Sequence, residues 1–451
     1  MKKHIFALSL VSIAFLVSGC SKNNDHSNGD SPETIKVDFV KSFGGTKNES
    51  AKAVIKTSDG GYAILGYTQS IDIDITNKSN DSFDYWLLKF NQNDALEWQK
   101  TFGGTDDDRG NDIIQTHDGG YAIIGFSKSS DGHVTENNGA HDYWVSKLDA
   151  SGTISWEKNY GFLGADIGNS IIQTHDGGFL LTGVLDVSAS NGEGNSKNTK
   201  SKSSRIQHAG GDYWAIKINA TGEIAWRRYY GGSFTDTPYD VIQTEDKGYL
   251  IVGSSDSADV DINNNKGTYD FWVVKISEAG TLVWEQSFGG SQTDEARAIV
   301  KSNDGNYIIV GDTRSNDFDV STNKGAADLW VIKISPTGNL IWEKTFGGSS
   351  FDVARSISKT QDNDFIISGN SRSLDGNLTN NNGQNDAWVI KVDTNGNLKW
   401  QKTIGGSEID FAYDAVELND KSLIIVGNSS SSNLDLSNNR GFTDLLLFKI
   451  K

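Results

Sequence analysis

Several residue types that define other protein classes are scarce in this chain. Its 451 residues include one cysteine, three prolines, one methionine and seven histidines. A single cysteine excludes a disulfide framework, and neither a His/Cys metal-site spacing nor a phosphate-binding GxxxxGK[ST] loop occurs. Basic residues are also outnumbered, because 41 Lys and Arg stand against 59 Asp and Glu, giving a formal net charge of −18. That balance argues against nucleic acid as a partner and against adsorption to an anionic membrane.

Long apolar runs are scarce too, and the clearest lies at the N-terminus. Residues 1–19 combine two lysines, an apolar stretch and small residues, which predicts a signal peptide. The stretch is too short for a membrane span. The run LVSG before Cys20, the sole cysteine, resembles the bacterial lipobox. We therefore predict that Cys20 is the lipidated first residue of the mature protein, carrying palmitate or a similar acyl chain. The alternative is a free thiol in the core.

The residues after this cysteine indicate where in the cell the protein is located. Residues 20–34 are polar and rich in Ser, Asn and Gly, which predicts a flexible tether. Ser21 rather than Asp follows the cysteine, and this resembles Gram-negative lipoproteins of the outer membrane. The Ser-Lys start resembles tethers of surface-displayed lipoproteins, which favours the cell surface and leaves the periplasmic side as the alternative. The membrane would then be contacted only through the lipid.

What the chain has in abundance is one repeated unit. Its 49 glycines and 12 tryptophans recur at fixed offsets, and fixed periods identify repeat architectures. Six tryptophans lie in a D-x-W-x-x-K pattern and six in the segment that follows it. Seven copies cover 42–100, 101–158, 159–228, 229–286, 287–344, 345–402 and 403–451.

Each copy contains four short apolar runs separated by turn residues, which predicts four strands. Seven such units predict an all-β fold, a seven-bladed β-propeller of four-stranded antiparallel blades over residues 35–451. The last copy ends after its third run, while Ile35–Phe43 resembles a fourth strand that precedes any first strand. We therefore expect the N-terminal strand to close the last blade. An open solenoid is the alternative, but it would need distinct polar caps.

The repeat resembles a known class. Its FGG, DGGY, D-x-W-x-x-K and G-x-x-x-W segments are similar to repeats of bacterial secreted and lipid-anchored β-propellers. The segment 149–156 also resembles the tryptophan-docking motif of quinoprotein propellers, although its Asp-to-Gly spacing is one residue shorter. The resemblance implies the propeller fold and no particular activity or quinone cofactor.

The long loops indicate where a ligand would bind. The connections between blades, and those between second and third strands, are long and emerge on one face, which we call the long-loop face. Each connection between blades carries a carboxylate six residues past the phenylalanine of its Phe-Gly-Gly or that residue's equivalent, and we call these seven the junction carboxylates. As candidate ligand-binding residues they would hold cations or sugar hydroxyls; the alternative is that each caps its own turn. They are Glu49, Asp108, Asp166, Asp236, Asp294, Asp352 and Asp410.

The loops between second and third strands carry a pattern related to calcium sites. Oxygen-bearing residues stand at loop positions 1, 3, 5 and 12, as in an EF-hand loop. Glycine falls at position 9 rather than 6, and position 12 is Asp rather than Glu. Calcium is therefore one interpretation and a structural Asx loop the other. The candidate metal ligands are Asp259, Asp261, Asn263, Asp270, Asp317, Asp319 and Asp328.

Other conspicuous residues have structural interpretations. The tryptophans are expected to pack between blades, and the repeated lysine is expected to pair with a carboxylate that the sequence leaves open. The insertion 184–209 carries a basic stretch, which is either a flexible solvent-exposed loop or a binding site for an anionic partner.

No set of residues in the sequence has the pattern of a catalytic site. The sequence thus favours a non-catalytic propeller that binds a cell-surface protein or polysaccharide; the alternative is a glycan-active hydrolase or lyase that uses acidic residues on the long-loop face.

Overall fold

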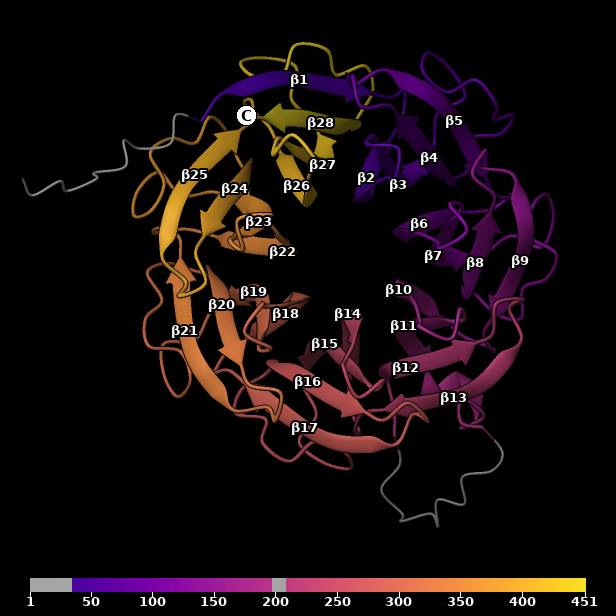
Figure 1. Ribbon diagram of the computed structural model, residues 1–451, viewed down its shortest axis with the longest axis vertical. Coiled ribbons are helices and arrows are strands. Elements are labelled where there is room, and N and C mark those ends of the chain that lie inside the picture. The colour runs from indigo at the N-terminus through magenta and orange to yellow at the C-terminus, as the bar shows by residue number, and fades with distance from the viewer. Residues whose placement is uncertain (1–34, 197–207) are drawn as a thin grey trace, which may run out of the picture. The chain divides into compact units, whose positions relative to one another are not determined.

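The computed structural model describes residues 35–196 and 208–451. The predicted signal peptide, Cys20, the tether and the basic part of the insertion lie outside these residues. Residues 35–451 form one compact unit that contains seven four-stranded antiparallel sheets. They are arranged as the blades of a propeller (Figure 1), so the predicted fold class is confirmed. Within the described residues, no helix combines the length and the apolar character needed to cross a bilayer.

The strands occupy four radial positions, from the axis outward (Figure 1). The innermost are β2 (Glu49–Lys56), β6 (Asp108–Gln115), β10 (Ile167–Gln173), β14 (Asp236–Gln243), β18 (Asp294–Lys301), β22 (Asp352–Lys359) and β26 (Asp410–Glu417). The second are β3 (Tyr62–Thr68), β7 (Tyr121–Ser127), β11 (Phe179–Asp186), β15 (Tyr249–Ser255), β19 (Tyr307–Thr313), β23 (Phe365–Ser371) and β27 (Leu423–Ser429).

The two outer positions complete each blade. The third strands are β4 (Asp84–Phe90), β8 (Asp142–Leu148), β12 (Gly211–Ile218), β16 (Asp270–Ile276), β20 (Asp328–Ile334), β24 (Asp386–Val392) and β28 (Asp444–Ile450). The outermost are β5 (Leu96–Phe102), β9 (Ile154–Tyr160), β13 (Ile224–Tyr230), β17 (Leu282–Phe288), β21 (Leu340–Phe346), β25 (Leu398–Ile404) and, in the seventh blade, β1 (Val37–Phe43). A short helix, α1 (Val187–Ser190), follows β11 at the start of the insertion.

The seventh blade joins the two ends of the described chain. Its strand order is β1-β28-β27-β26, and β1 pairs antiparallel with β28 from Val37 opposite Ile450 to Phe43 opposite Leu445. Two backbone hydrogen bonds between Lys36 and Lys451 extend this pairing. The predicted closure by the N-terminal strand is therefore confirmed, and no open solenoid forms.

The core lies between neighbouring blades. The third strands are buried along their whole length, as in β16 and β20, which explains their continuous apolar runs. The tryptophan of each D-x-W-x-x-K pattern is no more than 1% exposed, and its indole N–H is satisfied; Trp272 Nε1, for example, donates to Glu285 Oε2 at 3.1 Å. The repeated lysine pairs with the hairpin aspartate of its own blade in six blades, as Lys275 does with Asp246 at 2.9 Å.

Candidate functional site

The structure places the seven junction carboxylates inside the protein. Six of them are the first residue of the innermost strand of a blade, and Asp166 lies immediately before β10. All seven are 0% exposed. In blade 5, Asp294 Oδ2 accepts hydrogen bonds from the Gly290 backbone N–H at 2.7 Å and from the Ser315 hydroxyl at 2.8 Å. Its Oδ1 accepts one from the Thr313 hydroxyl. These bonds fix the turn that enters the blade, so the carboxylate acts within its own fold.

A second buried carboxylate faces each junction carboxylate from the start of a third strand. A Cβ placed on Gly289 would lie 2.6 Å from Asp270 Oδ1 and 2.6 Å from Asp294 Oδ2, so both carboxylates contact this glycine and only glycine fits there. Burial raises the pKa of Asp270, and the nearby charge of Asp294 raises it further. Oδ1 of Asp270 has no hydrogen-bond partner among the described residues.

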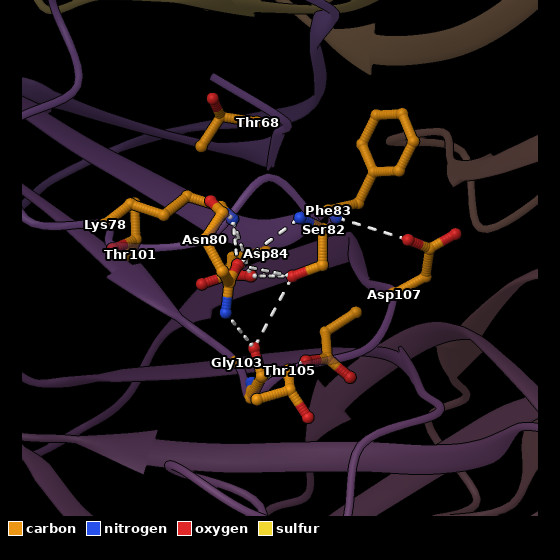
Figure 2. A network of polar contacts seen from close by, with 12 residues as sticks. Thr68, Lys78, Asn80, Ser82, Phe83, Asp84, Thr101, Gly103, Thr105 and Asp107 are labelled. Atoms are coloured by element: carbon orange, nitrogen blue, oxygen red, sulfur yellow. Dashed lines mark hydrogen bonds and ion pairs between the residues drawn. The ribbon is translucent and has the colours of Figure 1, made fainter. Parts of the chain in front are cut away.

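Blade 1 handles its third-strand aspartate differently. The Lys78 ammonium pairs with Asp84 Oδ1 at 3.2 Å, and the Ser82 hydroxyl lies 3.3 Å from the same oxygen. Asn80 Nδ2 donates to the Gly104 carbonyl at 2.8 Å. Figure 2 shows this network, in which the loop before β4 folds over the turn that leads into blade 2. Even with this lysine present, burial raises the pKa of Asp84 to about 6.

The candidate calcium loops use their oxygens to hold the same turns. Asp259 Oδ1 accepts the Ser233 N–H at 2.9 Å, and Asp261 Oδ2 accepts the Gly231 N–H at 3.3 Å. Asn263 donates to Glu285, and Asp270 Oδ2 accepts the Lys266 N–H. Blade 5 repeats the scheme with Asp317, Asp319 and Asp328. Among the described residues, no three His, Cys, Asp or Glu side chains converge as metal ligands. The geometry therefore assigns these oxygens to the loop itself.

The loops between second and third strands of five blades expose large apolar side chains on the long-loop face. We call this set the apolar crown; its exposed fractions run from 37% for Val260 to 72% for Phe318 and Leu374. Four members have positive φ, between 51° and 60°, a conformation that is strained for a bulky residue. The crown consists of Ile73, Val260, Phe318, Leu374, Leu434 and Phe442.

A set of residues at the axis was missed by the sequence analysis. In every innermost strand, one residue is extra in the pairing with the second strand, so a β-bulge forms at the third residue after the junction carboxylate. We call these seven bulge residues the axial ring. They are Lys52, Asn111, Asn169, Tyr239, Arg297, Arg355 and Tyr413.

Contacts within the axial ring run between innermost strands of neighbouring blades. The Lys52 ammonium lies 3.8 Å from the centre of the Tyr413 ring, and the Arg355 guanidinium lies 5.3 Å from that centre. The Arg297 guanidinium lies 4.3 Å from the Tyr239 ring centre. Asn169 Nδ2 donates to the Pro238 carbonyl at 2.7 Å. The axial ring therefore places three cationic side chains on the inside of an otherwise acidic protein.

Comparison with known proteins supports the fold and leaves the activity open. No family model matches the chain. It is 20% identical over 242 residues to Regulatory protein FlaEY of Caulobacter vibrioides, which covers 49% of this chain and 25% of that protein. It is 25% identical over 215 residues to the uncharacterized WD repeat-containing protein L264 of Acanthamoeba polyphaga mimivirus, covering 39% of this chain and 16% of that protein.

One solved structure shows the extent of the structural likeness. The WD40 domain of Neurospora crassa Pan2 superposes with a TM-score of 0.50 at 9% identity, covering 93% of this chain and 96% of that domain. This likeness shows the fold alone. The chain also spans a quarter or less of the length of the curated relatives it matches. Function must therefore be argued from this protein's own surface.

Proposed function

We propose that this chain is a lipid-anchored outer-membrane protein whose propeller binds a partner protein on its long-loop face and does not catalyse a reaction. The address rests on the signal-peptide pattern, the lipobox-like run before Cys20 and the polar tether. The binding role rests on the apolar crown. Display of the propeller at the cell surface would bring that crown into contact with other envelope or external proteins.

The apolar crown is the observation that carries the binding role. Exposed apolar patches on soluble domains mark interaction surfaces when the side chains gather on one face. Phe318 and Leu434 are 72% and 68% exposed, and both adopt positive φ. The equivalent position in blades 2 and 6 is glycine, Gly132 and Gly376, with the same sign of φ. The turn itself therefore does not require a large side chain, and contact with a partner explains why one is present.

The alternatives use features that lie elsewhere in the molecule. A glycan-active hydrolase or lyase needs accessible carboxylates, whereas the seven junction carboxylates are 0% exposed. A glycan partner is commonly held by open aromatic faces. Here six tryptophans are buried in the core and the other six are partly buried, and four of the six crown residues are aliphatic. These observations favour a protein partner.

Site-specific photocrosslinking in the native bacterium tests the binding role. A photoreactive amino acid replaces Phe318 in one strain and Thr337, an exposed residue of a short turn in the same blade, in a control strain. We expect a discrete crosslinked product from position 318 that is absent from position 337. Absence of any product at positions 318 and 434, or equal products at position 337, would contradict the proposal.

The proposed address is tested separately by acylation and fractionation. Cells grown with labelled palmitate should label the native chain and leave a Cys20→Ser variant unlabelled. The native chain should sediment with outer membranes, and protease added to intact cells should degrade it if it is surface-exposed. Recovery of unlabelled native protein in the soluble periplasmic fraction would refute the lipid anchor without bearing on the crown.

A further inference from the structure

Among the described residues, the axial ring contains two cations that form no ion pair. Within the described part of the chain, Lys52 forms no hydrogen bond and no ion pair. Its ammonium contacts only the rings of Tyr413 and Tyr67, at 3.8 and 5.6 Å. Arg355 likewise forms no ion pair there; its Nε lies 3.4 Å from Asn370 Oδ1. Both side chains are partly buried. Partly buried cations without an ion-pair partner are costly, because burial removes hydration that these contacts replace only in part.

Other cations of this protein show what is missing at the axis. Each repeated lysine has its own carboxylate, as in Lys333 with Asp304 at 2.7 Å. Arg297 of the axial ring pairs with Glu295, and Arg109 at the entrance pairs with Asp107 at 3.6 Å. Lys52 and Arg355 instead lie on the two sides of blade 7, and both approach the ring of Tyr413. The unmatched pair is therefore local to blades 6, 7 and 1.

The chemistry of the surroundings selects the kind of anion. The faces of Tyr413 and Tyr67 already carry cations, with Arg109 5.2 Å from the Tyr67 ring centre, so these rings are not open for stacking on a sugar. Glu295 and Asp312 lie near Arg297, and the charge of Asp312 also acts on Arg355, so these carboxylates would repel a dianionic group such as a phosphate at this position. A single carboxylate fits these limits, since a guanidinium and an ammonium can share its two oxygens.

The titration of Lys52 is consistent with a missing anion. Burial lowers the pKa of Lys52 to about 7, and the charges of Arg355 and Arg109 lower it further. The groups facing it are Arg355 on β22, Tyr413 on β26, Arg109 on β6 and Tyr67 on β3. The neighbouring carboxylate of Asp414 on β26 is turned to the Val54 backbone N–H, which donates to it at 2.8 Å. A bound carboxylate would restore the ammonium and draw one proton from solvent near neutral pH.

We propose that Lys52 and Arg355 together bind one carboxylate of an acidic segment of the partner protein, presented at the long-loop mouth of the axis while the rest of that partner contacts the apolar crown. This inference rests on the proposed function and names the chemistry of its partner. In this proposal, the axial ring recognises the charge of the partner, and the apolar crown supplies most of the contact area with it. A partner large enough to cover both is a protein rather than a small anion.

Calorimetric titration of the full chain at physiological ionic strength tests the carboxylate site. The probes are hexaglutamate, hexaglutamine and an oligogalacturonate. We expect hexaglutamate to bind, hexaglutamine not to bind, and Lys52→Met and Arg355→Gln each to weaken hexaglutamate binding about tenfold or more. Lys56→Met is the matched control, because Lys56 is an exposed lysine at the other end of the same strand, and its binding should equal the native value.

Proton uptake separates a direct role of Lys52 from a structural one. Titrations at pH 7.5 in buffers of different ionisation enthalpy should reveal uptake of protons on hexaglutamate binding by the native chain and by Lys56→Met. The uptake should vanish in Lys52→Met. Because the native free amine is partly deprotonated at this pH, binding should also strengthen as the pH falls below about 7.

Three results would overturn the inference. They are the absence of hexaglutamate binding, binding that Lys52→Met and Arg355→Gln leave unchanged, and tighter binding of the oligogalacturonate than of hexaglutamate. The crosslinking result at Phe318 separates these failures from failure of the proposed function. A crosslinked partner that persists in Lys52→Met, together with no hexaglutamate binding, would retain the docking face and reject the axial carboxylate site.

Discussion

The ammonium of Lys52 lies over the ring of Tyr413, 3.8 Å from its centre, and thereby joins the innermost strands of blades 1 and 7. A cation over an aromatic face is stabilised by the ring quadrupole. The guanidinium of Arg355 from blade 6 approaches the same ring. The pKa of Lys52 therefore depends on two opposite effects, the favourable contact with Tyr413 and the repulsion from Arg355.

The first prediction concerns this ionisation. In Arg355→Gln the nearby positive charge is removed, so the pKa of Lys52 should rise from about 7 toward the ordinary lysine value. In Tyr413→Leu the aromatic face is lost, so the pKa should fall. Carbon-13 NMR of reductively dimethylated protein measures both. A shift of the same sign in the two variants would contradict this description of the contact.

The second prediction concerns the strained crown positions. Ile73 is β-branched and has φ of 57°, whereas blades 2 and 6 place glycine there with φ of 65° and 69°. Replacing Ile73 by glycine should raise the free energy of unfolding by about 1 kcal/mol, because glycine adopts this region without a steric penalty. Urea denaturation measures the change. The companion change Ile75→Gly should destabilise the protein, since Ile75 is 2% exposed and packs in the core.

The third prediction follows from the buried carboxylates that face each other between blades. The folded-state pKa of Asp270 is raised, so the folded protein holds a proton that the unfolded chain has released. Its stabilising contribution is complete below the unfolded pKa of about 4 and is lost as the pH rises through the folded pKa near 7. Asp270→Asn removes this ionisation and should gain about 1–3 kcal/mol at pH 8 relative to the native chain.

The measurement is urea denaturation of the native chain and Asp270→Asn between pH 4 and 8. The advantage of the variant should shrink toward pH 4, where the native carboxyl is protonated. Asp106→Asn, at an exposed carboxylate between blades 1 and 2, serves as the control and should follow the native curve. An advantage of Asp270→Asn that is constant across the range would exclude the titration as its cause.

The fourth prediction concerns ring closure. Deleting residues 35–43 removes β1, the outermost strand of blade 7, and uncovers the edge of β28 along the whole pairing from Val37 to Phe43. We expect a lower melting temperature and association between molecules, because an unpaired strand edge templates further pairing. Differential scanning calorimetry and analytical ultracentrifugation measure the two effects. A monomer with the native melting temperature would show that closure contributes nothing to stability.

The architecture could be predicted from the sequence because the same motif recurs in seven copies. The recurrence of Trp272 and its five counterparts established the period, and the run of Val273–Ile276 had the composition of a strand covered on both faces. The position of residues 35–43 before any first strand identified the closing strand. Repetition averages out local ambiguity, so a pattern that is weak in one blade becomes clear over seven.

The site could be predicted only in part, and the reason is geometric. The junction carboxylates were identified by their recurrence, but whether Asp294 faces solvent or a backbone N–H depends on how the neighbouring loop folds over it. The axial ring was missed because a bulge breaks the alternation from which side-chain direction is inferred. One signal was available: the third residue after each junction carboxylate varies among Lys, Asn, Tyr and Arg, while the position just before it is always Ala, Gly or Pro.

The bulge has a consequence for how this protein can change. A residue that stands outside the ladder is free of the demands of strand pairing, so exchanging it leaves the register of the two innermost strands undisturbed. Lys52 and its six counterparts are therefore seven positions at which the side chain can vary while the strand pairing stays the same. If the axial ring binds a charged group, propellers with the same fold and other residues in the axial ring would bind other charged groups. A new specificity could then arise by single substitutions at these positions.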